Sequence, residues 1–258
     1  MELITFDILS KFSKIVHFCS TRYGGVSVGN YASMNLSPFS GDDVDHQLEN
    51  LNVLCENLNC NNIIIPFQTH GTEIRLIDKD FIQKNLSERS DLLYGIDALI
   101  TNDVNVCIGV TTADCVPLIF YDPLKDVIAV AHAGWRGTCA RIAEKVIQRM
   151  QEQFGCDPRN LNVVIGPSIS ADVYKVGIEL LDDFKLAGFP VDEIFHTERD
   201  LLFLDLWKAN QWLLEFVGVP TEQIQISEIC TYTQHKKFFS ARRLGIKSGR
   251  MLSAIMLK

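Results

Sequence analysis

Two short apolar runs separated by a tight turn constrain the fold of this chain more than any other feature. Residues 116–121 and 127–131 are rich in β-branched and aromatic side chains, and Asp122-Pro123 marks a turn between them. Strands paired across a tight turn bring their outer ends together. Cys115 precedes the first run and His132 follows the second, so we expect these two side chains to reach one point.

A thiolate and an imidazole at one point form a ligand pair suited to zinc or copper. Two ligands do not complete a site, so a third must come from elsewhere in the chain. His70 is well placed, because it follows the buried run at residues 63–65 and precedes Gly71. A histidine that only hydrogen-bonds nearby backbone groups fits the same pattern, so the residues alone leave the metal open.

Two other segments are candidates for binding an anion. Arg22 precedes a Gly24-Gly25 loop, where backbone N–H groups and a guanidinium can hold an anion together. Arg136 stands just before a helix predicted over residues 138–154, whose start carries partial positive charge. Each has a structural alternative: an ordinary glycine turn for Arg22, and cover for the edge of the core for Arg136.

The remaining pattern predicts the fold class. Asp42-Asp43 can cap a helix beginning near Val44, with Leu48 and Leu51 on its apolar face, and His17 lies mid-strand as a core histidine. Strand-like runs and helices are mixed along the chain rather than strictly alternating, and no linker or repeat divides it. We therefore expect an α+β fold, a single domain over residues 1–258 with mixed β-sheets and helices packed outside.

Charge and cysteine usage limit the function classes. A net charge of −8 and a pI near 5.2 argue against nucleic acid as the main partner. The eight cysteines include no C-x-x-C pair, and a chain of this size does not need disulfides. The first seven residues show no signal-peptide pattern, and no run approaches the ~18 apolar residues of a membrane span. We predict a reduced, cytoplasmic protein with no membrane partner.

Six short motifs occur in order along the chain. They are Thr21-Arg22-x-Gly-Gly-Val-Ser, Gln68-Thr-His70-Gly, Thr112-Ala-Asp114-Cys115-x-Pro, His132-Ala-Gly-Trp-Arg-Gly, Ile165-Gly-Pro and Phe-Phe-Ser-x-Arg242-Arg243. Through them the sequence resembles the laccase-domain (polyphenol oxidase, YfiH-like) family, whose members are read as zinc-dependent purine nucleoside phosphorylases and adenosine deaminases. Two positions depart from the family pattern: Leu51, where arginine is usual, and Ala241, where an aromatic residue is common.

The resemblance implies a metal site and a set of substrates. Its metal ligands fall on His70, Cys115 and His132, which supplies the third ligand that the hairpin lacks. Three protein ligands leave a fourth position open, as in catalytic rather than structural zinc sites. Copper is a possible competing metal, because it binds such ligands more tightly. The implied substrates are inorganic phosphate and purine nucleosides: adenosine, inosine and methylthioadenosine.

Individual roles follow as hypotheses. Arg22 and Arg136 are candidates for binding phosphate, which a guanidinium holds bidentately. Asn35 and Gln68 are candidates for ribose hydroxyls or the base edge. Asp114, beside the ligand Cys115, is the candidate for carrying the proton in deamination; its alternative role is to bond backbone N–H groups and shape the loop. Catalysis would then rest on Asp114, Cys115 and His132.

Three rival functions use the same residues differently. A copper polyphenol oxidase of the multicopper design needs paired His-x-His motifs, and this chain has six histidines and no such pair. A metal-free hydrolase would use Cys115 as its nucleophile and His132 or His70 as the base. A zinc-stabilised interaction module would need four protein ligands, and the sequence offers three.

Overall fold

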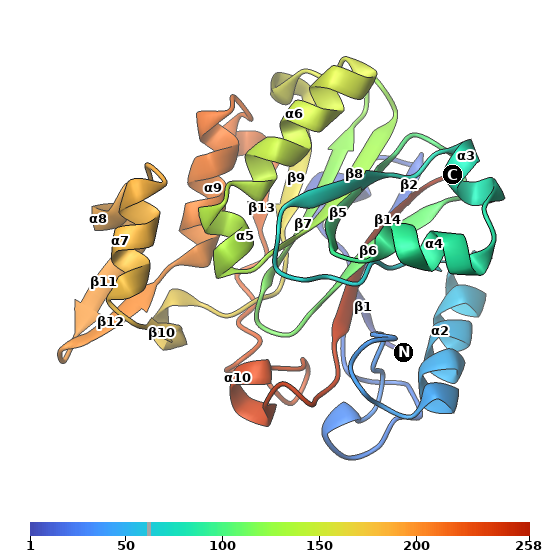
Figure 1. Cartoon of the computed structure of the whole chain (residues 1–258), viewed down its shortest axis with the longest axis horizontal. Helices are drawn as coiled ribbons and strands as arrows, with labels where there is room; N and C mark the ends of the chain where they lie inside the picture. Colours follow the sequence, from blue (N-terminus) through green and yellow to red (C-terminus); the bar gives the residue numbers. More distant parts are fainter. Residues whose placement is uncertain (61–62) are drawn as a thin grey trace.

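The computed structural model of the chain describes residues 1–60 and 63–258, and in it two large β-sheets lie between layers of helices (Figure 1). In the six-stranded sheet, β4 is parallel to β5 and β13 is parallel to β9, while the other neighbours are antiparallel. Its order is β13 (Ile224–Ile226), β9 (Asn162–Ile165), β7 (Val116–Asp122), β8 (Val127–Ala133), β5 (Ile96–Thr101) and β4 (Glu73–Leu76).

The second large sheet is also mixed, since β3 is parallel to β6 and the remaining pairs are antiparallel. Its order is β1 (Leu3–Ile4), β2 (Ile15–Ser20), β14 (Met251–Leu257), β6 (Cys107–Thr112) and β3 (Ile63–Ile64). A small third sheet is ordered β10 (Lys175–Val176), β12 (Leu201–Leu204) and β11 (Phe195–Glu198). The α+β expectation is confirmed.

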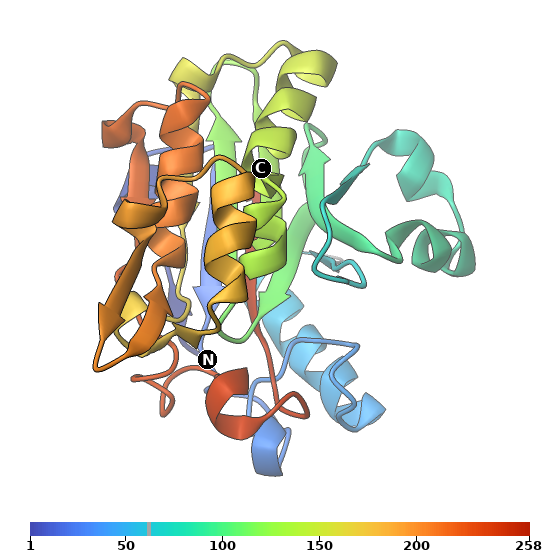
Figure 2. The same ribbon diagram turned by 60° about the vertical axis from the view of Figure 1, so that its left-hand side comes forward.

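The helices of the described residues are α1 (Asp7–Ser10), α2 (Val44–Leu58), α3 (Lys79–Gln83), α4 (Leu86–Leu93), α5 (Trp135–Cys139), α6 (Ile142–Phe154), α7 (Glu179–Leu186), α8 (Val191–Ile194), α9 (Leu206–Phe216) and α10 (Ala241–Leu244). Of these, α5, α6 and α9 pack on the six-stranded sheet, whereas α7 and α8 lie beside the small third sheet (Figures 1 and 2). Among the described residues, no helix combines the length and apolar character needed to cross a bilayer.

The central hairpin is buried on both faces, which explains why its strands read as continuous apolar runs. Side chains alternate between the faces of a strand. On β7, Leu118 and Phe120 therefore pack toward α6 and α9, whereas Ile119 and Tyr121 pack toward the other large sheet. The predicted hairpin is confirmed, with Val116 opposite Ala133 at its outer end.

Helix α2 forms as predicted, but the apolar face assigned to it was wrong at one position. Leu48 is 54% exposed, whereas Asn50 is fully buried. Asn50 Nδ2 donates to the carbonyls of Ser33 and Asn35, and its Oδ1 accepts from the backbone N–H of Val26. A polar residue takes the inward position because it ties the N-terminal loop to the helix.

The helix predicted over residues 138–154 is two helices. α5 begins three residues earlier than predicted, and Arg141 between α5 and α6 has a φ of 62°. A left-handed residue ends a right-handed helical run. Arg136 therefore lies inside the short helix α5, and its predicted place just ahead of a long helix was wrong.

The buried His17 makes stability depend on pH. Its Nε2 accepts a hydrogen bond from the Phe6 N–H at 2.9 Å, as expected for a core histidine. Burial lowers the pKa of His17 from 6.5 to about 4. The unfolded chain therefore binds a proton first as pH falls, so stability present above pH 6.5 is lost on the way to pH 4.

We expect His17→Gln to remove most of this dependence, because an amide oxygen still accepts the Phe6 hydrogen bond without titrating. The difference in unfolding free energy between the parent and the variant should change by about 2–3 kcal/mol between pH 7 and pH 4.5. Urea unfolding at the two pH values measures it. A difference that is the same at both pH values would assign the acid sensitivity to other groups.

Candidate metal centre

Three side chains from separate segments meet at the outer end of the hairpin. One ligand atom from each of His70, Cys115 and His132 lies within 4.8 Å of the other two. The imidazole rings of His70 and His132 are edge to face, with centroids 4.7 Å apart. In the hairpin register His132 lies opposite Pro117, and Pro117 is two residues after Cys115. The hairpin thus brings Cys115 and His132 together, and the loop after β3 adds His70.

Asp97, on the neighbouring strand β5, fixes the orientation of His132. Its Oδ1 lies 2.8 Å from His132 Nδ1, with both side chains buried. An imidazole that donates from Nδ1 to a carboxylate presents Nε2 as its metal-binding atom. Asp97 was not among the residues predicted from the sequence, although a lone carboxylate within the apolar run Gly-Ile-Asp-Ala-Leu-Ile indicates a buried partner.

The same carboxylate also holds the His70 loop. Asp97 accepts hydrogen bonds from the backbone N–H groups of Thr69, His70 and Gly71 at 2.7–3.2 Å. His70 has a left-handed φ of 63°, a conformation that these bonds stabilise. Burial alone would raise the pKa of Asp97, but the bonds from His132 and from the backbone hold that pKa below its usual value. One anionic side chain therefore positions two of the three candidate ligands.

The chemistry of the three donors fits a soft or borderline metal ion. Burial raises the pKa of Cys115, but the two histidines outweigh it and bring that pKa to about 6. The thiolate is the form of cysteine that binds metals. A Cβ added at Gly134 would lie 3.0 Å from Cys115 Sγ and 3.3 Å from His70 Cδ2, so only glycine keeps this space open. His70 is exposed, which leaves one side of the cluster accessible.

The three candidate ligands line a cavity of about 300 Å³ that is partly open to solvent. Drug-sized and nucleoside-sized ligands occupy cavities from about this volume upward. Aromatic rings form one part of the wall, where Phe39 and Phe67 are edge to face at 4.9 Å. The other lining residues are Ser37, Ser40, Pro66, Gln68, Thr111, Thr112, Ala113, Ala241, Ile246 and Arg250.

Arg250 is the one arginine among the described residues that line this cavity, and it was not among the residues predicted from the sequence. Its Nη1 and Nη2 donate to backbone carbonyls of residues 246, 248 and 249. Burial lowers the pKa of Arg250, against the opposing effect of the nearby Cys115 and Asp114. Among the described residues Arg250 forms no ion pair, and Nε donates no hydrogen bond. Buried charges are usually paired, so this guanidinium is suited to an anionic ligand.

Neither arginine selected from the sequence lines the cavity. Arg22 donates from Nε and Nη1 to the carbonyls of Ala32 and His235, and its guanidinium lies 4.8 Å from the centroid of Phe239. These contacts join the N-terminal loop to the C-terminal segment. Arg136 is exposed and lies over the ring of Trp135 at 4.3 Å. The structure therefore places both arginines outside the walls of the cavity that holds the metal ligands.

The two amides selected from the sequence are held by the protein itself. Asn35 is fully buried, and its Nδ2 donates to Ser40 and Asp42 while its Oδ1 accepts from the backbone N–H of Arg250. Gln68 does line the cavity, but both ends of its amide bond Thr111 on β6. Asn35 thus anchors Arg250, and Gln68 anchors the loop that carries His70.

Asp114 is a buried acceptor at the back of the Cys115 loop, and it does not line the cavity. Its carboxylate accepts hydrogen bonds from Thr231 Oγ1 at 2.7 Å, Ser240 Oγ at 3.0 Å and the Arg242 N–H at 2.7 Å. These three donors fix the C-terminal segment against the loop of Cys115. The geometry favours the structural alternative for Asp114 over proton transfer.

We expect Asp114→Asn to lower stability rather than chemistry. Asparagine tolerates the left-handed φ of 86° at this position, so the variant isolates the loss of charge. The NH₂ group of the new asparagine can only donate, and it would face groups that also donate. The unfolding free energy should therefore fall by about 2–4 kcal/mol. Turnover per bound metal ion should stay within about tenfold of the parent. If Asp114 carried the proton, the variant would instead lose ~10²- to 10⁴-fold in turnover per bound ion while keeping its stability.

Both departures from the family pattern fall on cavity walls. Ala241 lines the cavity with the metal ligands, and Leu51 lines a neighbouring apolar cavity. Substitutions at these two positions therefore change the walls without changing the candidate ligands.

Known proteins resemble this chain over nearly its whole length. A family model described as multi-copper polyphenol oxidoreductase laccase matches residues 16–258. The chain is 42% identical to a purine nucleoside phosphorylase of Bacteroides thetaiotaomicron, over 99% of this chain and 96% of that protein. It is 37% identical over the whole length of both chains to a protein named adenosine deaminase RL5, from an unknown prokaryotic organism.

Solved structures with a closely similar fold exist. The protein YfiH of Bacillus licheniformis superposes with a TM-score of 0.89 at 31% identity, over 95% of this chain and 93% of that one. YlmD of Geobacillus stearothermophilus gives a TM-score of 0.88 at 31% identity, over 96% and 93%.

Proposed function

We propose, from the premise that this chain belongs to the multi-copper polyphenol oxidoreductase laccase family, that it is a zinc-dependent purine nucleoside phosphorylase that also deaminates adenosine. The observation that carries the proposal is the His70, Cys115 and His132 cluster in the wall of a cavity of nucleoside size. Relatives named for each of the two activities align over nearly the whole chain. The proposed substrates are adenosine, inosine and methylthioadenosine, with inorganic phosphate as the second substrate.

Zinc suits the cluster better than the copper of the family's name. Multicopper oxidases need a second, histidine-rich centre for three copper ions. Within residues 1–60 and 63–258, the cluster at His70 is the one group of metal-binding side chains close enough to share an ion. His70, Cys115 and His132 would hold a zinc ion, which would supply Lewis-acid chemistry toward water or substrate.

The chain's own residues account for binding and orientation. Phe39 and Phe67 line the cavity with aromatic rings against which a purine can pack. Arg250 lines the cavity and forms no ion pair with the described residues, so its guanidinium is the proposed partner of phosphate in a protein of net charge −8. Asp97 holds the two histidines in place, so the ligand geometry is preorganised before substrate arrives.

Product analysis tests the pair of activities. Incubation of inosine with the zinc-loaded protein and phosphate should yield hypoxanthine and ribose 1-phosphate, and adenosine without phosphate should yield inosine. Free ribose as the sugar product would indicate hydrolysis, and turnover by metal-free protein that thiol alkylation abolishes would favour the Cys115-dependent hydrolase. No conversion of any nucleoside would contradict the proposal.

A further inference from the structure

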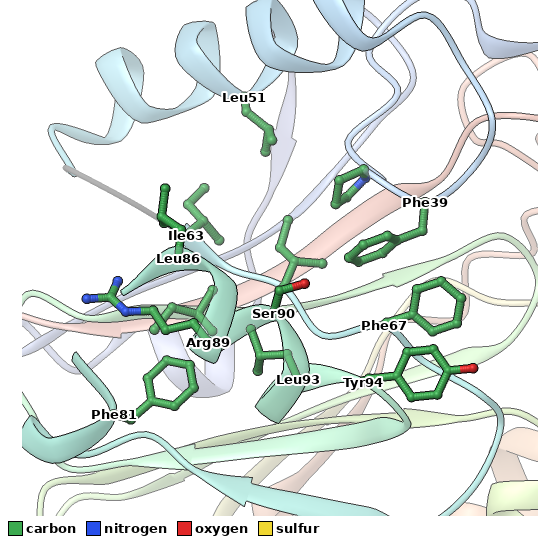
Figure 3. A pocket seen from close by; sticks show the side chains of 13 residues that line it. Phe39, Leu51, Ile63, Phe67, Phe81, Leu86, Arg89, Ser90, Leu93 and Tyr94 are labelled. Carbon is green, nitrogen blue, oxygen red and sulfur yellow. The ribbon is translucent and has the colours of Figure 1, made fainter. Parts of the chain in front are cut away.

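A second cavity, of about 250 Å³, adjoins the one with the metal ligands (Figure 3). It lies between α2, the run at residues 63–65 and the α3–α4 segment. Phe39 and Phe67 line both cavities, so their edge-to-face pair forms the common wall. Tyr94 stacks on the far side of Phe67, with centroids 4.9 Å apart. The wall shared by the two cavities therefore consists of aromatic side chains and not of backbone strands.

The walls of the second cavity are apolar, with Leu51, Ile63, Ile65, Phe81, Leu86 and Leu93 around it. Its one cation is Arg89, whose Nε and Nη2 donate to the carbonyls of Lys84 and Ile82. The Arg89 guanidinium also lies over the Phe81 ring at 5.9 Å. Ser90 and Tyr94 supply the other polar side chains of the lining, and Tyr94 is 68% exposed. This cavity is therefore suited to an uncharged apolar group and poorly suited to a phosphate.

We infer, on the basis of the proposed function, that the second cavity receives an apolar 5′ substituent of a purine nucleoside. Both proposed reactions occur at the purine or at the glycosidic bond, and those atoms must face the metal ligands. The 5′ carbon is the exocyclic ribose position that can carry a substituent without altering either reacting centre. The substrate class then extends from methylthioadenosine to nucleosides with longer 5′-alkylthio groups.

A substrate series measures this directly: adenosine, methylthioadenosine, 5′-propylthioadenosine and 5′-butylthioadenosine, with adenosine 5′-monophosphate as the charged comparison. Each added methylene should raise kcat/KM about fourfold, the equivalent of about 0.8 kcal/mol per buried CH₂. The gain should be in KM, because the substituent is bound equally in ground state and transition state. Calorimetric binding of the same series to metal-free protein should follow the same order.

Two exposed serines of α4 provide matched variants. Ser90 lines the cavity and Ser87, on the same helix, does not. Ser90→Phe should fill the cavity and remove the gain from longer substituents while adenosine turnover is kept. Ser87→Phe should behave as the parent. Leu51→Gln, on the opposite wall, should also reduce the rise in kcat/KM with longer substituents, because it makes the wall polar without filling the cavity.

The possible outcomes separate the two claims. Turnover of adenosine and inosine with no gain along the series would overturn the inference and leave the proposed function standing. A gain that Ser90→Phe does not reduce, or a greater gain from the 5′-phosphate, would also overturn it. Absence of turnover with every nucleoside would instead contradict the proposed function itself.

Discussion

Cys115→Ala is expected to lose its bound zinc and its activity on nucleosides together. Loss of a partner that only orients a metal ligand already weakens metal affinity ~10- to 100-fold. Cys115 is itself a candidate ligand, and with it the cluster loses its one anionic donor, so we expect affinity and turnover to fall by more than about 100-fold. Elemental analysis of the purified protein and a nucleoside assay measure the two quantities.

The chain offers a matched control for this variant. Cys139 is a partly buried thiol in α5 that lies outside the cavity lining. Cys139→Ala should keep one zinc ion per chain and the parental turnover. Zinc content in Cys115→Ala equal to that of the parent would show that the metal is held by other residues, and the assignment of the ligands would have to be abandoned.

Arg250→Lys is expected to weaken the response to phosphate selectively. Lysine keeps the charge but not the planar fork that binds phosphate through two parallel hydrogen bonds. Loss of one charged contact costs about 1.5–3 kcal/mol, so the KM for phosphate in inosine cleavage should rise roughly 10- to 100-fold. Adenosine deamination, which uses no phosphate, should change far less. Steady-state kinetics with phosphate as the varied substrate give the comparison.

Arg22→Gln and Arg136→Gln distinguish this assignment from the one suggested by the sequence. Neither side chain lines the cavity that holds the candidate metal ligands, so neither variant should change the phosphate KM more than a few-fold. Arg22→Gln should lower stability instead. A large rise in the phosphate KM for Arg136→Gln, with Arg250→Lys unchanged, would move the anion site to α5.

Sequence patterns predicted the elements whose conformation depends on residues adjacent in the chain. The hairpin of β7 and β8 was predictable because its turn and its two apolar runs are adjacent in sequence, and it determines where Cys115 and His132 meet. The break between α5 and α6 was not predictable, because arginine has a high helix propensity and Arg141 nevertheless has a left-handed φ. In the folded chain its Nη1 donates to the carbonyl of Ala187, a contact 46 residues away that the local pattern does not show.

The contacts that complete the site are long-range, and a single sequence does not show them. Asp97 is 35 residues from His132, and Asn35 is 215 residues from Arg250. A polar residue in a motif fits a contact to substrate as well as a contact to backbone, so Asn35 and Gln68 were interpreted as substrate ligands. The hydrogen-bond partners of both amides within the protein lie on segments that the folded sheets bring together.

The most direct test of the central claim is nucleoside turnover as a function of metal per chain. Protein stripped with a chelator is refilled in steps with zinc and, in parallel, with copper. We predict that phosphate-dependent cleavage of inosine rises linearly with zinc, reaches its maximum at one ion per chain, and is absent in the metal-free protein. Full turnover without metal, or oxidation of phenols by the copper form with no nucleoside activity in the zinc form, would contradict the account.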